Sequence, residues 1–281
     1  MISDGATDTR LAPILVYLLE KRGLDFSGYH PNMLGRRIRR RLLATCCTDS
    51  EEYLSCLQRS DAELDQLLDA LTINVSRFFR DSLTFELIAD RILPVLITEK
   101  TKAHDLSLRV WSAGCARGEE PYSLAILIRE LLEKEKLEIN LHLFATDIDP
   151  GALRSAARAV YPLASVDHIK HRLVSKYFVR QGNSFSLIPA IKDLVSFSSH
   201  DILDKKSGVP PESVFGGFDL VLCRNLLIYF NTACQETIFG RLHQALAEKG
   251  YLILGEAEAP SLKHERYFDR VFDFSQIYRK R

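Results

Sequence analysis

Residues 109–125 read RVWSAGCARGEEPYSLA and indicate a strand, a glycine loop and a helix in succession. Arg109–Ala113 has the β-branched and aromatic character of a strand end. Gly114 and Gly118 give the backbone the freedom for a tight loop, and Pro121 suits the first turn of a helix, where its missing N–H is no loss. This succession brings a nucleotide or nucleoside against a sheet edge, although a plain tight turn explains the loop equally well.

The composition places limits on the class of protein. The chain has 281 residues, enough for about two domains, and its 46% hydrophobic and 26% charged content indicates a folded core. Basic and acidic residues both number 37, so the net charge favours neither nucleic acid nor a membrane surface. No apolar run is long enough to span a bilayer, and the N-terminus lacks a secretory pattern. Six cysteines and eight histidines show no metal spacing, so we expect a reduced, cytoplasmic protein without a metal.

The first 70 residues favour a small helical domain. A helix expected over residues 32–45 carries Leu34, Ile38 and Leu42 on one apolar stripe. Ser60 followed by Glu63 is typical of a capping box at the start of another helix. We therefore expect a helical domain over residues 1–70 and an α/β domain over 71–281.

The helix over residues 32–45 is also rich in arginine. Like charges this dense repel one another on a helix, and no acidic residue is interleaved with them. We expect a surface for docking an acidic protein or a phosphate backbone, made by Arg36, Arg37 and Arg40. A solvated helix face is the plain alternative.

Further polar residues follow the predicted strands. Asp147 ends a strand over residues 141–147, where an acid accepts hydrogen bonds from ribose hydroxyls. Asp149 starts the next helix and is expected to be its N-cap. Arg224, Asn225 and Tyr229 follow a buried strand over 218–223, and ligands bind at such carboxyl ends.

Two other segments stand out. Residues 72–81, TINVSRFFRD, lie where the helical domain should meet the sheet. They are expected to fold over the sheet as a lid, or alternatively to be a hydrophobic linker clamped to the core. Short strand-like runs between residues 172 and 198 predict an inserted antiparallel β subdomain.

Several chemistries are excluded by missing motifs. The chain has no G-x-S-x-G elbow and no G-x-x-x-x-G-K-[ST] loop, which counts against a serine hydrolase and a P-loop nucleotidase. The loop at Gly114–Gly118 is not a G-x-G-x-x-G either, which counts against a dehydrogenase.

Four blocks of sequence, in order, resemble the signature blocks of the CheR family, the S-adenosylmethionine-dependent glutamate methyltransferases of chemotaxis receptors. The blocks are NVSRFFRD at 74–81, VWSAGCARGEEPYS at 110–123, ATDID at 145–149 and CRNLLIYF at 223–230. The resemblance implies an α/β, Rossmann-like methyltransferase fold with a small N-terminal all-helical domain and an inserted small antiparallel β subdomain.

The resemblance also implies roles for individual residues. Arg80 and Tyr229 are expected at the methyl transfer, Arg80 orienting the acceptor and Tyr229 facing the methyl group. The residues expected to hold the cofactor are Asn74, Ser76, Arg80, Glu120, Asp147, Asp201, Ile202, Arg224 and Asn225. The family often has threonine where this chain has Ser76, and the hydroxyl is retained. Asparagine is common in the family where this chain has Asp201. A carboxylate cannot donate a hydrogen bond to adenine as an amide can, so the Asp201 contact departs from the family pattern.

The resemblance implies a reaction and a partner. S-adenosylmethionine would methylate glutamate carboxylates on the cytoplasmic helices of methyl-accepting chemoreceptors, with S-adenosylhomocysteine as product. Such carboxylates are ionised near neutral pH, so no general base is needed. We expect a monomer that neither binds nucleic acid nor inserts into a membrane. The alternatives are a methyltransferase for another substrate, and a sensor that binds S-adenosylmethionine without turnover.

Overall fold

The computed structural model describes residues 11–204, 207–213 and 216–281. The expectation about a secretory leader falls on residues 1–10 and lies outside the described residues. The chain divides into two compact units, which we describe separately. The first comprises Met1–Asn74 and Ile228–Gln235, and the second comprises Val75–Leu227 and Glu236–Arg281.

Between residues 11 and 74, the first unit contains four α-helices, and their ends follow the local sequence. They are α1 (Ala12–Arg22), α2 (Pro31–Ala44), α3 (Ser50–Arg59) and α4 (Asp61–Thr72). Ser60 caps α4 as predicted, since its hydroxyl accepts from the backbone N–H of Glu63 at 3.2 Å. The other half of the capping box does not form. The Glu63 carboxylate instead accepts from Arg41 at 2.5 Å and from the Tyr53 hydroxyl at 2.7 Å.

The chain returns to this unit at Ile228–Gln235. Here the rings of Tyr29 and Phe230 lie 4.6 Å apart, and the Tyr229 carbonyl accepts from the N–H of His30 at 2.9 Å. The expected limits of 1–70 and 71–281 did not include this return of the chain. The reason is that pairing between segments two hundred residues apart leaves no local signal in the sequence.

The second unit is built on a seven-stranded sheet, in the order β6-β2-β1-β7-β8-β10-β9. The first five strands pair in parallel, and β10 pairs antiparallel with both of its neighbours, β8 and β9. The bounds are β1 (Ser107–Ala113), β2 (Asn140–Asp147), β6 (Val195–Ser199), β7 (Phe218–Cys223), β8 (Leu246–Leu254), β9 (Phe268–Arg270) and β10 (Ile277–Lys280). This arrangement confirms the predicted Rossmann-like fold.

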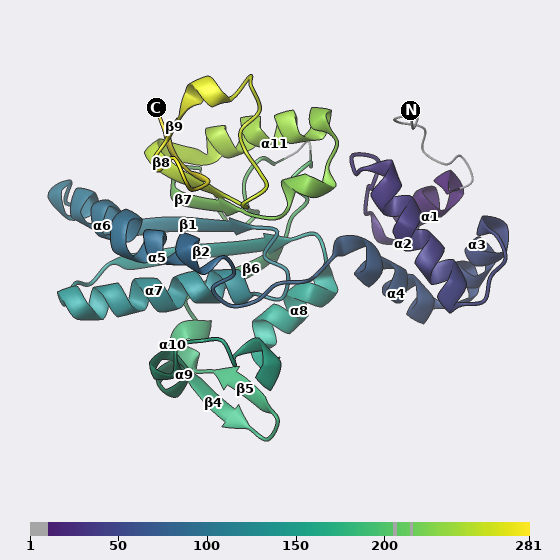
Figure 1. The fold of residues 1–281 in the computed structure, drawn as a ribbon, viewed down its shortest axis with the longest axis horizontal. Coiled ribbons are helices and arrows are strands. Elements are labelled where there is room, and N and C mark those ends of the chain that lie inside the picture. The colour runs from purple at the N-terminus through teal and green to yellow at the C-terminus, as the bar shows by residue number, and fades with distance from the viewer. Residues whose placement is uncertain (1–10, 205–206, 214–215) are drawn as a thin grey trace. The chain divides into compact units, whose positions relative to one another are not determined.

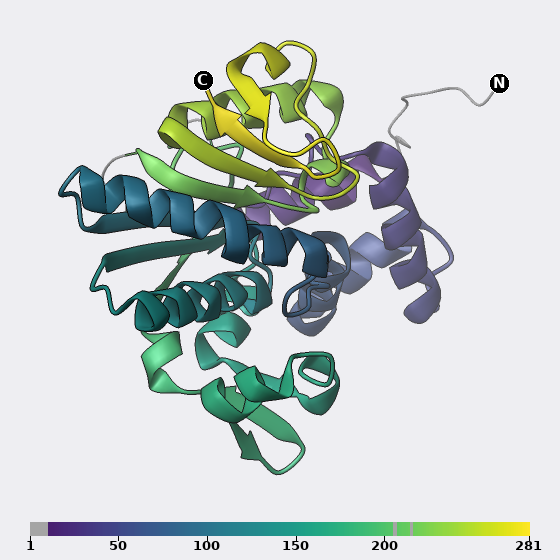
Figure 2. The ribbon, with the colours of Figure 1, turned by 60° about the vertical axis from the view of Figure 1, so that its left-hand side comes forward.

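Helices cover both faces of the sheet, with α7 and α11 on opposite sides (Figures 1 and 2). A continuous helical stretch precedes β1, and its central turn is a π-helix, Ile88–Ile92. The α-helices of this unit are α5 (Ser82–Leu87), α6 (Leu93–Lys102), α7 (Glu119–Glu135), α8 (Pro150–Arg158), α9 (His171–Tyr177), α10 (Pro189–Lys192) and, from Glu236 onward, α11 (Thr232–Ala245). Burial of both sheet faces explains why β7 is apolar almost throughout.

A second, three-stranded antiparallel sheet forms the β subdomain, in the order β3-β5-β4. Its strands are β3 (Val160–Pro162), β4 (Phe178–Gln181) and β5 (Ser184–Leu187). The predicted limits of 172–198 were wrong at both ends. Val195–Ser199 is instead β6, the edge strand of the main sheet, paired in parallel with β2. A short strand-like run predicts extended structure but not its partner.

Candidate functional site

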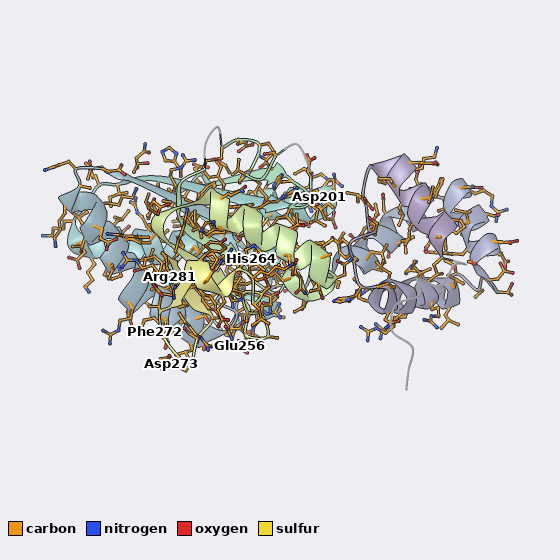
Figure 3. The ribbon with its side chains drawn as sticks, turned by 90° about the horizontal axis from the view of Figure 1, so that it is seen from above. Asp201, Glu256, His264, Phe272, Asp273 and Arg281 are labelled. Atoms are coloured by element: carbon orange, nitrogen blue, oxygen red, sulfur yellow. The ribbon has the colours of Figure 1, made fainter. Side chains whose placement is uncertain are left out.

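The predicted site residues of the second unit gather at the carboxyl edge of the main sheet. Asp201 follows β6 at this edge (Figure 3), Asp147 ends β2, and the glycine loop follows β1. Arg224 and Asn225 follow β7 in the same row. In open α/β sheets this edge is the ligand-binding crevice.

The glycine loop is tied to the end of β2. The N–H groups of Gly114 and Cys115 both donate to the Thr146 carbonyl, at 2.8 and 2.9 Å. The Ala116 N–H donates to Oδ2 of Asp147 at 2.8 Å. Gly118 has φ +90°, and a Cβ there would lie 2.9 Å from Cβ of Ala156. The loop therefore needs glycine for its conformation and for its close packing.

Asp147 is a buried carboxylate that can accept further hydrogen bonds. It is 8% exposed, and its Oδ1 accepts from the N–H of Asp149 at 3.0 Å while Oδ2 accepts from Ala116. Burial raises the pKa of Asp147. An ionised carboxylate accepts about four hydrogen bonds, so Asp147 keeps acceptor capacity beyond the bonds that the backbone donates to it. Asp149 caps α8 through Oδ1, which confirms its predicted structural role.

Arg224 joins three parts of the site. Its side chain is 1% exposed, with Nη1 3.0 Å from Oε2 of Glu120 and Nη2 2.6 Å from Oδ2 of Asp81. Nη2 also donates to the Arg80 carbonyl at 2.9 Å. The resemblance implied that Arg224 lines the cofactor pocket. In the structure, its guanidinium bonds Glu120 and the lid segment, and the pocket-lining role stays a prediction.

The lid segment, which we define as Val75–Asp81, is anchored rather than loose. Phe78 is fully buried, the Phe79 N–H donates to the Ser123 hydroxyl at 2.9 Å, and Phe79 and Asp81 have positive φ values of 49° and 58°. This anchoring agrees with the alternative of a segment clamped to the core. Ser76 and Arg80 remain partly accessible, and Arg80 Nη1 donates to the Val75 carbonyl at 3.3 Å.

One residue of this edge was missed in the sequence. Glu258 is 4% exposed, and its Oε2 accepts from the N–H groups of Asn225 and Gly255, at 2.8 and 2.7 Å. These two residues follow β7 and β8, so Glu258 ties the ends of both strands together. A Cβ on Gly255 would lie 2.7 Å from this carboxylate oxygen. No short motif marks Glu258, because its link to Asn225 joins residues 33 positions apart in sequence.

The segment after β6 also lies at the carboxyl edge of the sheet. The His200 N–H donates to the Asp147 carbonyl at 3.0 Å, which holds this segment beside β2. Oδ1 of Asp201 accepts from the Leu203 N–H at 2.8 Å. Ile202 is 7% exposed, and its carbonyl accepts from Arg241 at 2.5 Å.

The remaining predicted residues lie in the first unit. Asn74 donates from Nδ2 to the Thr72 hydroxyl at 3.2 Å, and Tyr229 lies in a 3-10 turn. Arg36 and Arg40 are exposed on α2. Arg37 is half-buried and donates to the Ala70 carbonyl at 2.6 Å, and burial lowers its pKa. Arg37 therefore serves the packing of this unit as well as its surface.

The donor and acceptor set of the edge suits a nucleoside that carries an ammonium group. Ribose hydroxyls and an ammonium are donors, and the edge offers carboxylates at Asp147, Glu120 and Asp201. The doubly wound sheet, the glycine loop and the acid after β2 together define the class of Rossmann-like nucleoside-binding proteins.

Comparison with known proteins identifies the family. Residues 74–275 match the family described as CheR methyltransferase, SAM binding domain, and residues 10–72 match CheR methyltransferase, all-alpha domain. The chain belongs to the CheR methyltransferase family, and S-adenosylmethionine is its cofactor.

Named relatives extend over most of the chain. It is 32% identical to the chemotaxis protein methyltransferase of Salmonella typhimurium, over 90% of this chain and 84% of that protein. It is 27% identical to the chemotaxis protein methyltransferase of Borreliella burgdorferi, over 90% of this chain and 88% of that protein. It is also 34% identical, over 91% of its length, to an uncharacterized 104.1 kDa protein of Rhodobacter capsulatus, of which it spans 26%. Across the described residues, none of the helices has the length and apolar character needed to cross a membrane.

Proposed function

We propose that this chain transfers a methyl group from S-adenosylmethionine to glutamate carboxylates on the cytoplasmic helices of chemoreceptors, forming glutamate methyl esters. The match to both family domains carries this proposal, since an all-alpha CheR domain accompanies the cofactor-binding domain. The Salmonella and Borreliella relatives are named chemotaxis protein methyltransferases. Such a substrate implies that the reaction takes place in the cytoplasm.

When bound, the cofactor supplies a methyl group on a positively charged sulfonium. The acceptor glutamate is ionised near neutral pH and needs no base, so the protein's task is to align the reactants and to exclude water. The partly accessible Arg80 guanidinium is suited to orient the incoming carboxylate by charge-assisted hydrogen bonds. In this proposal Asp147 accepts from the ribose hydroxyls, Glu120 holds the methionine end, and Tyr229 faces the methyl group.

The first unit supplies a docking surface in this proposal. Arg36 and Arg40 are exposed on α2, whereas Arg41 is paired with Glu63 and Arg37 is bonded to a backbone carbonyl. Arg39 is exposed as well, but its Nε donates to the Gly35 carbonyl at 3.1 Å. Arg36 and Arg40 are therefore the arginines most available to an acidic receptor helix. Long-range attraction of this kind raises the association rate and weakens with salt.

The main experiment measures transfer of labelled methyl from S-adenosylmethionine to a receptor cytoplasmic fragment. We expect base-labile label on the receptor, lost in Arg80→Ala and strongly reduced in Tyr229→Phe. Both variants should still bind S-adenosylhomocysteine measurably, because the proposal leaves the ribose and adenine contacts to other residues. Tight cofactor binding without transfer to any receptor fragment would support the sensor instead, and label on nucleic acid would support another substrate.

A charge-matched pair of double variants tests the docking surface. Arg36→Gln with Arg40→Gln removes two exposed charges from α2, and Lys21→Gln with Arg59→Gln removes two exposed charges elsewhere in the same unit. We expect the α2 double variant to have a higher KM for the receptor and a weaker salt dependence of that KM. The control double variant should change little in either. If both double variants changed the KM for the receptor and its salt dependence to the same extent, a docking role for α2 would be contradicted.

A further inference from the structure

A tyrosine of the β subdomain contacts two separate segments of the cofactor edge. Tyr161 lies in β3 and is 4% exposed. Its hydroxyl donates to the Arg117 carbonyl, in the glycine loop, at 2.8 Å. Its ring packs edge-on against Phe78 of the lid segment, with the ring centroids 4.8 Å apart and the planes at 79°. One side chain thus holds both segments.

The β subdomain also holds the lid segment by two other residues. The ring of Phe178, in β4, lies 5.3 Å from that of Phe78 at 81°. Nε2 of His168 lies 2.7 Å from the Phe78 carbonyl oxygen. Phe78 is fully buried between these groups. The conformation of the lid segment is therefore set in part by the β subdomain, which lies below α7 in Figure 2.

The glycine loop rests directly on Tyr161. A Cβ added to Gly118 would lie 3.2 Å from the Tyr161 hydroxyl. Gly118 is also the N-cap of α7, with a left-handed φ of +90°. The hydroxyl of Tyr161 therefore contacts the loop where its path turns into the helix that carries Glu120.

We propose that Tyr161 is a positioning residue for S-adenosylmethionine, because it fixes the glycine loop and the lid segment to one rigid group. The residue has no need to touch the cofactor. Holding two binding segments in place before the ligand arrives lowers the ordering cost of binding. The inference rests on cofactor binding by the family fold and not on the identity of the methyl acceptor.

The test compares two buried tyrosines whose hydroxyls donate hydrogen bonds to different segments. Tyr161→Phe removes the bond to the Arg117 carbonyl and keeps the ring. Tyr122→Phe is the control, since the Tyr122 side chain is equally buried but its hydroxyl donates to the Ala156 carbonyl of α8, at 3.0 Å. We expect S-adenosylhomocysteine, titrated by calorimetry, to bind about fivefold more weakly to Tyr161→Phe, the equivalent of about one hydrogen bond, and unchanged to Tyr122→Phe.

A second measurement separates positioning from a general loss of stability. Amide hydrogen exchange in Tyr161→Phe should become faster in the glycine loop, which loses its bond to the hydroxyl, and should change less in the lid segment, which keeps the ring contact with Phe78. In Tyr122→Phe the exchange of these two segments should stay as in the wild type. Wild-type affinity in Tyr161→Phe, or an equal loss of affinity in both variants, would overturn the proposal. Neither measurement uses a receptor, so the result is independent of the proposed methyl acceptor.

Discussion

The Arg224 guanidinium lies between the carboxylates of Asp81 and Glu120, at 2.6 and 3.0 Å. Asp81 ends the lid segment, and Glu120 is in the first turn of α7. Since the Arg224 side chain is 1% exposed, these charges interact largely out of contact with water. The centre of the guanidinium also lies 5.3 Å from the centroid of the Phe85 ring. A single buried cation therefore links the end of β7, the lid segment and α7.

Substitution of Arg224 should reduce the stability of the protein. Arg224→Lys keeps the charge, but one ammonium cannot bond Asp81, Glu120 and the Arg80 carbonyl in the planar geometry of a guanidinium. We expect the free energy of unfolding to fall by about 3 kcal/mol, as for other broken buried pairs, with weaker binding of S-adenosylhomocysteine. Urea unfolding and calorimetry measure the two effects.

The exposed pair of Arg129 and Glu133, at 2.8 Å on α7, provides the control for that experiment. Arg129→Lys should cost less than about 0.5 kcal/mol, because exposed pairs of this spacing contribute little. A similar cost for Arg129→Lys and Arg224→Lys would contradict the role assigned to Arg224.

Asp147→Asn should weaken cofactor binding. The aspartate accepts from two backbone N–H groups at once, and an asparagine would turn its NH₂ group towards one of these donors. We expect S-adenosylhomocysteine to bind about thirtyfold more weakly, the equivalent of about 2 kcal/mol. Because burial raises the pKa of Asp147, wild-type affinity should begin to fall at a higher pH than an ordinary aspartate would give.

The neighbouring aspartate gives a matched comparison for this substitution. Asp149 caps α8, and asparagine caps helices as well as aspartate does. Asp149→Asn should therefore leave both stability and affinity close to the wild type. If Asp149→Asn weakened binding as much as Asp147→Asn, the ribose assignment would lose its support.

Loss of the hydrogen-bond acceptor at Glu258 should reduce stability and cofactor affinity more than loss of its negative charge. Glu258→Ala leaves the N–H groups of Asn225 and Gly255 without their acceptor, at a cost of about 1–3 kcal/mol for each buried donor. Glu258→Gln retains an oxygen for both. We expect the order wild type, Gln, Ala in both unfolding free energy and affinity for S-adenosylhomocysteine. Equal losses in the two variants would show that the negative charge matters rather than the acceptor.

The sequence predicted those parts of the site that depend on neighbours in the chain. The strand, glycine loop and helix over residues 109–125 form as expected, and so do the caps at Ser60 and Asp149. These features follow from backbone freedom and from side chains that bond two or three residues ahead. The fold class followed as well, because strands and helices alternate regularly.

The parts that the sequence left open depend on partners far along the chain. The sequence placed Arg224 at the end of a strand but did not show that its bonds reach residues 80, 81 and 120. Glu258 shows no pattern of its own, and β6 was assigned to the wrong sheet because its partner is fixed by the crossover through the β subdomain. Such contacts are set by the packing of the whole unit.

A final prediction concerns Glu119, which begins α7 beside the glycine loop. It is 4% exposed, its Oε2 has no hydrogen-bond partner in the described part of the chain, and burial raises its pKa above the ordinary 4.5. The unfolded chain therefore loses this proton at a lower pH than the folded protein does. The group's contribution to stability is complete below about pH 4.5 and is lost as the pH rises through the folded pKa.

Glu119→Gln removes this titration and keeps the shape of the side chain. We expect the variant to gain stability relative to the wild type as the pH is raised from 4 to 8, measured by urea unfolding at each pH. Glu135→Gln, at the exposed end of the same helix, matches the change in net charge and should show no such gain. If the curves of Glu119→Gln and the wild type ran parallel, the carboxyl of Glu119 would be ionised in the folded protein at no cost. A ligand or water bonded to its Oε2 would then have to supply the missing hydrogen bond.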